Sequence, residues 1–183
     1  MSARRDFLKT ASAGLLVVTP ETAFTYQANS TVEVGIVGCG GRGNWIAPFF
    51  PEFTGARVVA LADVQRANLE STAEKLKVEK SRAYVGPDAY QKLAESKLDA
   101  VVIETPTIYH AEQGLAAVRA GKHVFMAKPV AVDVPGCRMV LESGNLARKK
   151  GLTFWVDFQS RARDVYKEAV ERVRRGDIGK PAF

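Results

Sequence analysis

The chain has 183 residues, of which 46% are hydrophobic and 25% charged, so it can bury the core of one globular domain and still carry flanking segments. Its net charge of +6 comes from scattered basic residues, and no stretch combines clustered arginines with interleaved aromatic residues, which argues against nucleic-acid binding. The two cysteines form no Cys-x-x-Cys pattern and the two histidines stand on different predicted elements, so we expect neither a disulfide framework nor a metal site.

Residues 1–30 differ in character from the rest of the chain. The run 3–9, Ala-Arg-Arg-Asp-Phe-Leu-Lys, resembles a twin-arginine export motif with alanine where serine or threonine is usual. The mildly apolar segment 10–18 is too short to span a bilayer as a helix. We therefore expect a twin-arginine-type signal, or alternatively a disordered tail, and no membrane span. The protein would be periplasmic, or cytoplasmic if the signal does not function.

The first predicted strand, 32–37, leads into a glycine-rich turn with the pattern G-x-G-x-x-G. We expect Gly38 to allow a tight turn, Gly40 to let the backbone approach a diphosphate, and Gly43 to let the next helix pack closely on the strand. That helix start would also offer unpaired N–H groups and a partial positive charge to phosphates. The predicted phosphate site therefore includes Gly38, Gly40, Gly41, Arg42 and Gly43.

The second predicted strand, 57–63, ends in an acidic residue, Asp63, twenty residues after Gly43. Strand, glycine turn, helix, strand and terminal acid in this register are typical of dinucleotide binding, in which the acid accepts hydrogen bonds from the adenosine ribose. A generic strand–turn–helix or a methyl-donor nucleotide site is the alternative. The Asp63 carboxylate would repel a 2′-phosphate, which favours NAD over NADP. Arg42 and Arg66 could soften this preference, or be solvated loop arginines.

The remaining segments continue the alternation of strands and helices. Apolar runs and periodicity predict further strands over 83–85, 99–104, 123–126 and 152–156, and helices over 42–53, 65–77, 87–94, 107–120, 133–150 and 162–175. Strands separated by helices in this way predict an α/β fold with a doubly wound parallel sheet and right-handed crossovers, a Rossmann fold. His123 lies in a strand that should be buried, so we expect a core histidine with its polar atoms satisfied.

Two clusters follow strands at the edge of the sheet where ligands bind in such folds. They are Glu-Thr-Pro-Thr-Ile-Tyr-His at 104–110 and Phe-Met-Ala-Lys-Pro at 125–129. With the glycine turn, they resemble the Gfo/Idh/MocA oxidoreductases, which include glucose–fructose oxidoreductase and inositol dehydrogenase. That family combines the G-x-G-x-x-G turn with T-P-x-x-x-H, A-G-K-H-V and E-K-P. The resemblance extends from about residue 31 to the end of the chain.

The resemblance implies NAD- or NADP-dependent oxidation or reduction of a secondary alcohol in a sugar or cyclitol by hydride transfer. Lys128 matches the family lysine near the nicotinamide ribose and the substrate hydroxyl, so it is expected to bind the cofactor and to act in catalysis. Thr105 and Pro106 match positions that line the nicotinamide end. His110 matches a family histidine and is expected either to contact the cofactor or to cap or pack the helix.

Two departures from the family pattern affect these expectations. Ala127 stands where the family has the glutamate of E-K-P, which removes a possible partner of Lys128. Family members also continue into a second α+β domain that carries the substrate pocket and the oligomer face. We therefore expect a signal in 1–30, a dinucleotide-binding domain in 31–160, and a connecting helix with the start of a truncated substrate domain in 161–183. The full-length form would be a homo-oligomer. A non-catalytic or decayed dinucleotide-binding protein is the alternative.

Overall fold

The structure is a computed structural model that describes residues 31–179. The signal expected in 1–30 lies outside the described residues, as do the last four residues of the segment 161–183. No helix in 31–179 combines the length and the apolar character needed to cross a membrane.

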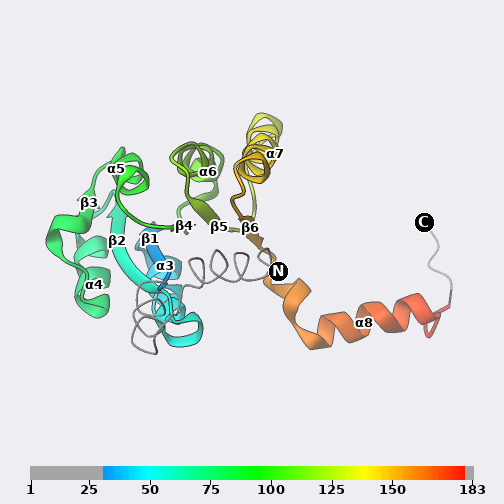
Figure 1. The fold of residues 1–183 in the computed structure, drawn as a ribbon. Helices are drawn as coiled ribbons and strands as arrows, with labels where there is room; N and C mark the ends of the chain where they lie inside the picture. Colours follow the sequence, from blue (N-terminus) through cyan, green and yellow to red (C-terminus); the bar gives the residue numbers. More distant parts are fainter. Residues whose placement is uncertain (1–30, 180–183) are drawn as a thin grey trace, which may run out of the picture. The chain divides into compact units, whose positions relative to one another are not determined.

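Six parallel strands form one sheet in the described part of the chain (Figure 1). Its order is β3-β2-β1-β4-β5-β6, and every neighbouring pair is parallel. The chain runs outward from β1 to β3 and then returns to place β4 on the other side of β1. This confirms the expected doubly wound α/β fold, and it makes the carboxyl ends of β1 and β4 the point where such sheets bind ligands. The strands are β1 (Glu33–Val37), β2 (Arg57–Asp63), β3 (Ala83–Val85), β4 (Ala100–Ile103), β5 (His123–Ala127) and β6 (Phe154–Asp157).

Helices connect the strands close to the predicted positions. Asp133 caps one of them, α7, because its Oδ1 accepts the N–H of Gly136 at 2.7 Å. The final helix, α8, stops at Gly176, which adopts the left-handed conformation. The helices are α3 (Gly41–Ile46), α4 (Arg66–Leu76), α5 (Ala89–Glu95), α6 (His110–Arg119), α7 (Val134–Lys149) and α8 (Asp164–Arg175). Short helical turns are η1 (Phe50–Thr54), η2 (Lys80–Arg82), η3 (Thr107–Tyr109) and η4 (Gln159–Ala162).

The single helix predicted over 42–53 is wrong, because α3 ends at Ile46 and the π-helical turn η1 follows. Pro48 has no N–H to donate to the carbonyl of Asn44, so the helical hydrogen bonding cannot continue. The ammonium group of Lys75 on α4 donates to that carbonyl oxygen instead, at 3.0 Å. The short α3 is therefore tied to α4 just behind the glycine turn.

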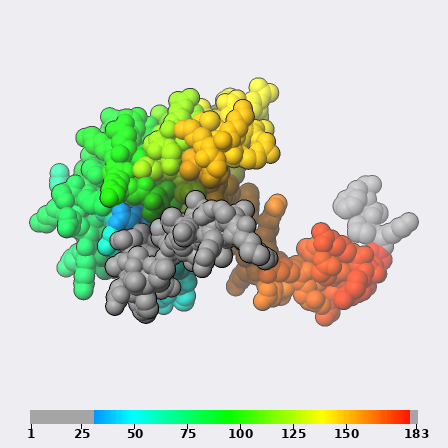
Figure 2. Space-filling view, in the orientation of Figure 1, coloured from blue at the N-terminus to red at the C-terminus, as the bar shows by residue number. Residues whose placement is uncertain are grey.

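Two apolar cores lie on the two faces of the sheet. Side chains of α5, α6 and α7 pack on one face, and these helices form a continuous green-to-yellow surface in Figure 2. The region of α3 and α4 packs on the other face, around Ile36, Leu61 and Leu69. By contrast, α8 has no buried residue, and Trp155 on the edge strand β6 is 60% exposed. The glycine turn follows β1, which lies near the middle of the sheet between the two cores.

Candidate dinucleotide-binding site

The glycine turn has the backbone geometry expected of its first and last glycines. Gly38 adopts φ +91°, and its N–H donates to the carbonyl of Ala62 at 2.8 Å. A Cβ atom on Gly38 would lie 2.8 Å from the carbonyl carbon of Glu104, and one on Gly43 would lie 1.8 Å from the carbonyl oxygen of Gly38. Both glycines are therefore required by the fold itself, which confirms the tight turn and the close packing of α3 on β1.

The middle of the turn is open. Among the described residues, a Cβ atom on Gly40 would meet only the side-chain amide of Asn68, at 3.6 Å, and one on Gly41 would meet nothing within 4 Å. The packing of residues 31–179 thus gives no reason for glycine at these two positions. Because α3 begins at Gly41, its first N–H groups have no acceptor within the helix. An open backbone with free N–H groups at the switch point of the sheet fits a diphosphate.

Asp63 joins the turn to the next helix. Its Oδ2 accepts the backbone N–H of Cys39 at 2.6 Å, and its Oδ1 accepts the N–H of Gln65 at 2.7 Å. A carboxylate offers about four lone-pair sites, so about two remain for ribose hydroxyls. The half-buried Asp63 is therefore fixed in place by the backbone while it can still accept hydrogen bonds from a ligand.

Cys39, between the first two glycines, is a packing residue. Its thiol is buried against the carbonyl of Ala62. Burial raises the pKa of the Cys39 thiol to about 12, and the charge of Asp63 acts in the same direction. A thiol with this pKa stays protonated at neutral pH and is no nucleophile.

Arg42 forms an ion-pair cluster at the carboxyl ends of two other strands. Its Nε lies 2.8 Å from Oε2 of Glu104, which follows β4, and its Nη2 lies 2.5 Å from Oδ2 of Asp157 at the end of β6. In the strand order, β4 and β6 lie on the opposite side of β1 from β2, which carries Asp63. The Arg42 guanidinium is therefore paired with these two carboxylates, and a contact of Arg42 with a 2′-phosphate stays a prediction.

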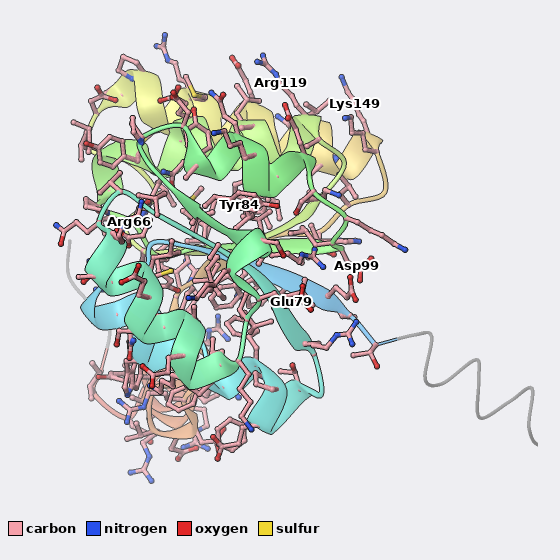
Figure 3. All side chains as sticks on the ribbon, turned by 90° about the vertical axis from the view of Figure 1, so that its left-hand side faces the viewer. Arg66, Glu79, Tyr84, Asp99, Arg119 and Lys149 are labelled. Atoms are coloured by element: carbon pink, nitrogen blue, oxygen red, sulfur yellow. The ribbon has the colours of Figure 1, made fainter. Side chains whose placement is uncertain are left out.

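Arg66, the other arginine considered for that role, begins α4. Its side chain is 72% exposed and 3.8 Å from Glu70. Figure 3 shows it pointing away from the body of the domain at one end of the strands, while Asp99 marks the other end. An exposed pair of this kind contributes little to stability, so Arg66 is free to reorient. A contact of Arg66 with a 2′-phosphate stays a prediction.

Glu104 is a functional candidate to which the sequence analysis assigned no role. Its side chain is fully buried, and neither carboxylate oxygen has a hydrogen-bond partner in the described structure. Arg42, whose Nε lies 2.8 Å from Oε2, forms an ion pair with this carboxylate. Burial raises the pKa of the Glu104 carboxyl, the charge of Arg42 opposes this rise, and Asp157 adds to it. The sequence did contain a signal for Glu104, because an acidic residue ends the apolar run 99–104.

The turns after β4 and β5 are joined by His110. Its ring is 1% exposed, with Nδ1 at 2.8 Å from the carbonyl oxygen of Pro129 and Nε2 at 2.8 Å from that of Thr105. The hydroxyl of Thr105 donates to Gln113 at 2.7 Å, and Pro106 is exposed. Both ring nitrogens face backbone carbonyl oxygens, which supports the packing alternative for His110. A contact of His110 with the cofactor stays a prediction.

Replacing His110 with alanine should destabilise the domain by about 2–4 kcal/mol, because a cavity forms and the contacts of the ring with the carbonyl oxygens of Thr105 and Pro129 are lost. Urea unfolding followed by circular dichroism measures the loss of stability.

His123→Ala is the matched control. His123 is exposed, not buried as expected, because it begins β5 at the open end of the sheet, where its Nδ1 accepts the N–H of Thr153. His123→Ala should lower the free energy of unfolding by about 1 kcal/mol or less. Equal losses in both variants would contradict the joining role of His110.

Lys128 is exposed immediately after β5 and has no hydrogen-bond or ion-pair partner among residues 31–179. The adjoining Pro129 is the residue whose carbonyl faces His110. Ala127, before Lys128, pairs in register with Asp157 on β6. The structure therefore brings the turn of Lys128, the turn of Thr105 and the glycine turn to one edge of the sheet.

Comparison with known proteins agrees with this site. Residues 32–158 match the Gfo/Idh/MocA family, described as "Oxidoreductase family, NAD-binding Rossmann fold". The chain is 35% identical over 152 residues to inositol 2-dehydrogenase 3 of Saccharopolyspora erythraea, covering 82% of this chain and 43% of that protein. The chain thus spans less than half the length of the curated relatives it matches.

Two solved structures share the fold. Scyllo-inositol dehydrogenase from Lactobacillus casei, with bound NAD(H) and scyllo-inositol, is 30% identical with a TM-score of 0.68, covering 82% of this chain and 43% of that one. A 3-ketoreductase from Actinomadura kijaniata, in complex with NADP and TDP-benzene, is 26% identical with a TM-score of 0.69, covering 82% and 46%. From its glycine turn, its strand order and the match over residues 32–158, this chain belongs to the Gfo/Idh/MocA oxidoreductase family with an NAD-binding Rossmann fold.

Proposed function

We propose that this chain is the coenzyme-binding part of an NAD(P)-dependent oxidoreductase that moves hydride between a nicotinamide coenzyme and a secondary alcohol of a sugar or cyclitol. The observation that carries the proposal is the open backbone at Gly40 and Gly41 beside Asp63, at the switch point of the sheet. The cyclitol bound by the Lactobacillus casei neighbour supports the substrate class.

Lys128 would supply the polar chemistry of the reaction. When bound, the nicotinamide ring accepts or donates the hydride. The exposed ammonium group of Lys128, unpaired among the described residues, donates a hydrogen bond to the substrate hydroxyl and stabilises the negative charge that develops on its oxygen. Thr105 and Pro106, in the turn after β4, line the same edge of the sheet.

Asp63 would set the preference for NAD over NADP, and its removal tests the proposal. Titration of NADH fluorescence should show binding by the wild-type chain and roughly tenfold to hundredfold weaker binding by Asp63→Ala, because hydrogen bonds to a charged acceptor are lost. NADPH should bind more weakly than NADH to the wild type, and this difference should shrink in the variant. Asp164→Ala, which changes a fully exposed carboxylate on α8, is the control and should bind as the wild type does. A folded chain that leaves millimolar NADH fluorescence unaltered would contradict the proposal.

A non-catalytic or decayed dinucleotide-binding protein is the second candidate, favoured by Ala127 in place of the family glutamate. Both candidates bind NADH, and they differ in turnover. A screen of sugars and cyclitols with NAD, in the longest form that the coding DNA encodes, separates them. Turnover supports the oxidoreductase, and binding without turnover supports the second candidate.

We also propose that the protein is exported to the periplasm and that its full-length form is a homo-oligomer. The twin-arginine-like run 3–9 supports export to the periplasm, and a reporter fusion that loses export when Arg4 and Arg5 become lysines would support it further. Homo-oligomerisation of the full-length form is supported by the exposed apolar residues of α8, which an assembled protein would cover. These residues are Val165, Tyr166, Val170 and Val173.

A further inference from the structure

We propose that Glu104 is a proton-linked counter-ion of the coenzyme site: it takes up a proton from solvent when a diphosphate occupies the glycine turn, and Arg42 then exchanges Glu104 for the diphosphate as its partner. This inference rests on the proposed function, because it requires a dinucleotide in the turn. It assigns Glu104 a positioning role that acts through Arg42.

The position of Glu104 places its carboxyl directly beneath the turn. Its N–H donates to the carbonyl of Val37, the last residue of β1, at 2.8 Å. A Cβ atom on Gly38 would touch the Glu104 backbone, and one on Gly43 would lie 3.4 Å from the Cβ of Glu104. A diphosphate held by the backbone of this turn would therefore add negative charge next to a carboxylate that is already buried.

The surroundings of Glu104 leave its negative charge dependent on a single cation. Among the described residues, Arg42 is the ion-pair partner of the Glu104 carboxylate, whose oxygens lack a well-aligned hydrogen bond, and the side chain is fully buried. Asp157 shares the same guanidinium, so the two carboxylates compete for one positive charge. A buried carboxylate without hydrogen bonds is stable only while its counter-ion stays. If Arg42 turned to another anion, Glu104 would accept a proton.

Arg42 is able to make that change. It belongs to the turn itself, and its side chain is 37% exposed, so a ligand in the turn can reach the guanidinium. A diphosphate presents paired oxygens that suit the fork of an arginine, and its charges are accessible where those of Glu104 are not. Asp157, with 14% of its side chain exposed, can remain the second partner. Until a diphosphate binds, the two carboxylates thus hold the Arg42 guanidinium beside the turn.

The other titratable groups nearby do not replace Glu104 in this role. Burial raises the pKa of the Cys39 thiol to about 12, so it stays neutral. His110 faces two backbone carbonyls, and Lys128 is exposed. The raised pKa of Glu104, caused first by burial, agrees with its assignment as the titrating group. The charged and titratable groups on the elements around Glu104 include Arg42 (α3), Cys39 (glycine turn), Asp63 (β2), His110 and Glu112 (α6), Lys128 (after β5) and Asp157 (β6).

The test is the pH dependence of NADH binding together with the proton uptake that accompanies it. Affinity is measured by NADH fluorescence between about pH 6 and pH 9, and proton uptake by calorimetry in two buffers of different ionisation enthalpy. The wild-type chain should take up as much as one proton, and its dissociation constant should rise by up to about tenfold per pH unit. ADP-ribose, which contains the diphosphate, should cause the same uptake, whereas adenosine should cause none.

Variants separate the roles of the two residues. Glu104→Gln mimics the protonated acid, so it should bind NADH without proton uptake and with an affinity that no longer depends on pH. Glu142→Gln makes the same chemical change on the exposed surface of α7 and should retain the wild-type pH dependence. Arg42→Gln should weaken NADH binding by roughly tenfold or more, since a charge-assisted contact with the diphosphate is lost.

The outcomes distinguish this inference from the proposed function. If the wild type binds NADH tightly and the binding enthalpy is the same in both buffers, no proton is taken up. This result would overturn the role of Glu104 and leave the coenzyme site intact. A folded wild-type chain that binds no NADH would contradict both the role of Glu104 and the proposed function. The calorimetry needs only the wild-type chain, so it decides the question even if Glu104→Gln fails to fold.

Discussion

Replacing Gly43 with alanine should destabilise the domain by at least about 3 kcal/mol, whereas Gly40→Ala should leave it folded but unable to bind a dinucleotide. The added methyl group on Gly43 would lie 1.8 Å from the carbonyl oxygen of Gly38, and neither backbone can move without separating α3 from β1. On Gly40 the methyl group would meet, among the described residues, only the Asn68 side chain, and it would occupy the space in which we expect the diphosphate to approach the backbone. Urea unfolding and NADH titration of both variants measure the two effects.

Gly144→Ala is the control for this pair. It adds a methyl group in the interior of α7 with no other group of residues 31–179 within 4 Å outside its own helix backbone, and it should stabilise the domain by up to about 1 kcal/mol, because alanine favours a helix over glycine. Wild-type stability in Gly43→Ala would show that the contact between α3 and β1 is not as close as described. Wild-type NADH affinity in Gly40→Ala would place the diphosphate outside this turn.

Replacing Lys128 with alanine should lower kcat for a sugar or cyclitol substrate by about 10²–10⁴-fold, because the group that stabilises the alkoxide is removed. The fold should be unaffected, since Lys128 is exposed and makes no hydrogen bond or ion pair within residues 31–179. Steady-state kinetics with NAD, in a form of the protein that shows turnover, measure the change. NADH titration shows whether the coenzyme still binds.

Two further lysine variants sharpen this experiment. Lys149→Ala removes a lysine from the last turn of α7, visible in Figure 3, and should retain wild-type turnover. Lys128→Arg keeps the charge but changes its shape, and it should recover part of the activity lost in Lys128→Ala. If Lys128→Ala turned over substrate as fast as the wild type, Lys128 would have no place in the mechanism.

Local sequence patterns predicted most of the secondary structure. The β-strands were predictable because each is a short apolar run between turn residues, and α7 was predictable because Asp133 and Pro135 mark its first turn. The break in the first helix had a local signal as well, since Pro48 lies within the predicted range. The reasons for glycine at Gly38 and Gly43 were also predictable, because a strand followed by G-x-G-x-x-G requires this turn.

The contacts of individual polar side chains could not be predicted in the same way. His123 was expected in the core because its strand is apolar, but a strand's first residue can lie outside the layers of helices that cover the sheet. His110 matched a motif whose residue types allow a cofactor contact, yet its two partners are carbonyls in separate turns. Whether a histidine binds a ligand or the protein depends on what surrounds its ring, and residue spacing does not contain that information.

The amino-acid sequence by itself determined that a glycine turn follows the first strand and that an acid ends the second, because these features depend on residues close together along the chain. Only the tertiary structure decided what Arg42 does. Its partner Asp157 is 115 residues away, and the two meet because the strand order brings the end of β6 toward the glycine turn. The same packing buried Glu104 beneath that turn. Charge pairing between distant strands is set by sheet order, which local periodicity does not encode.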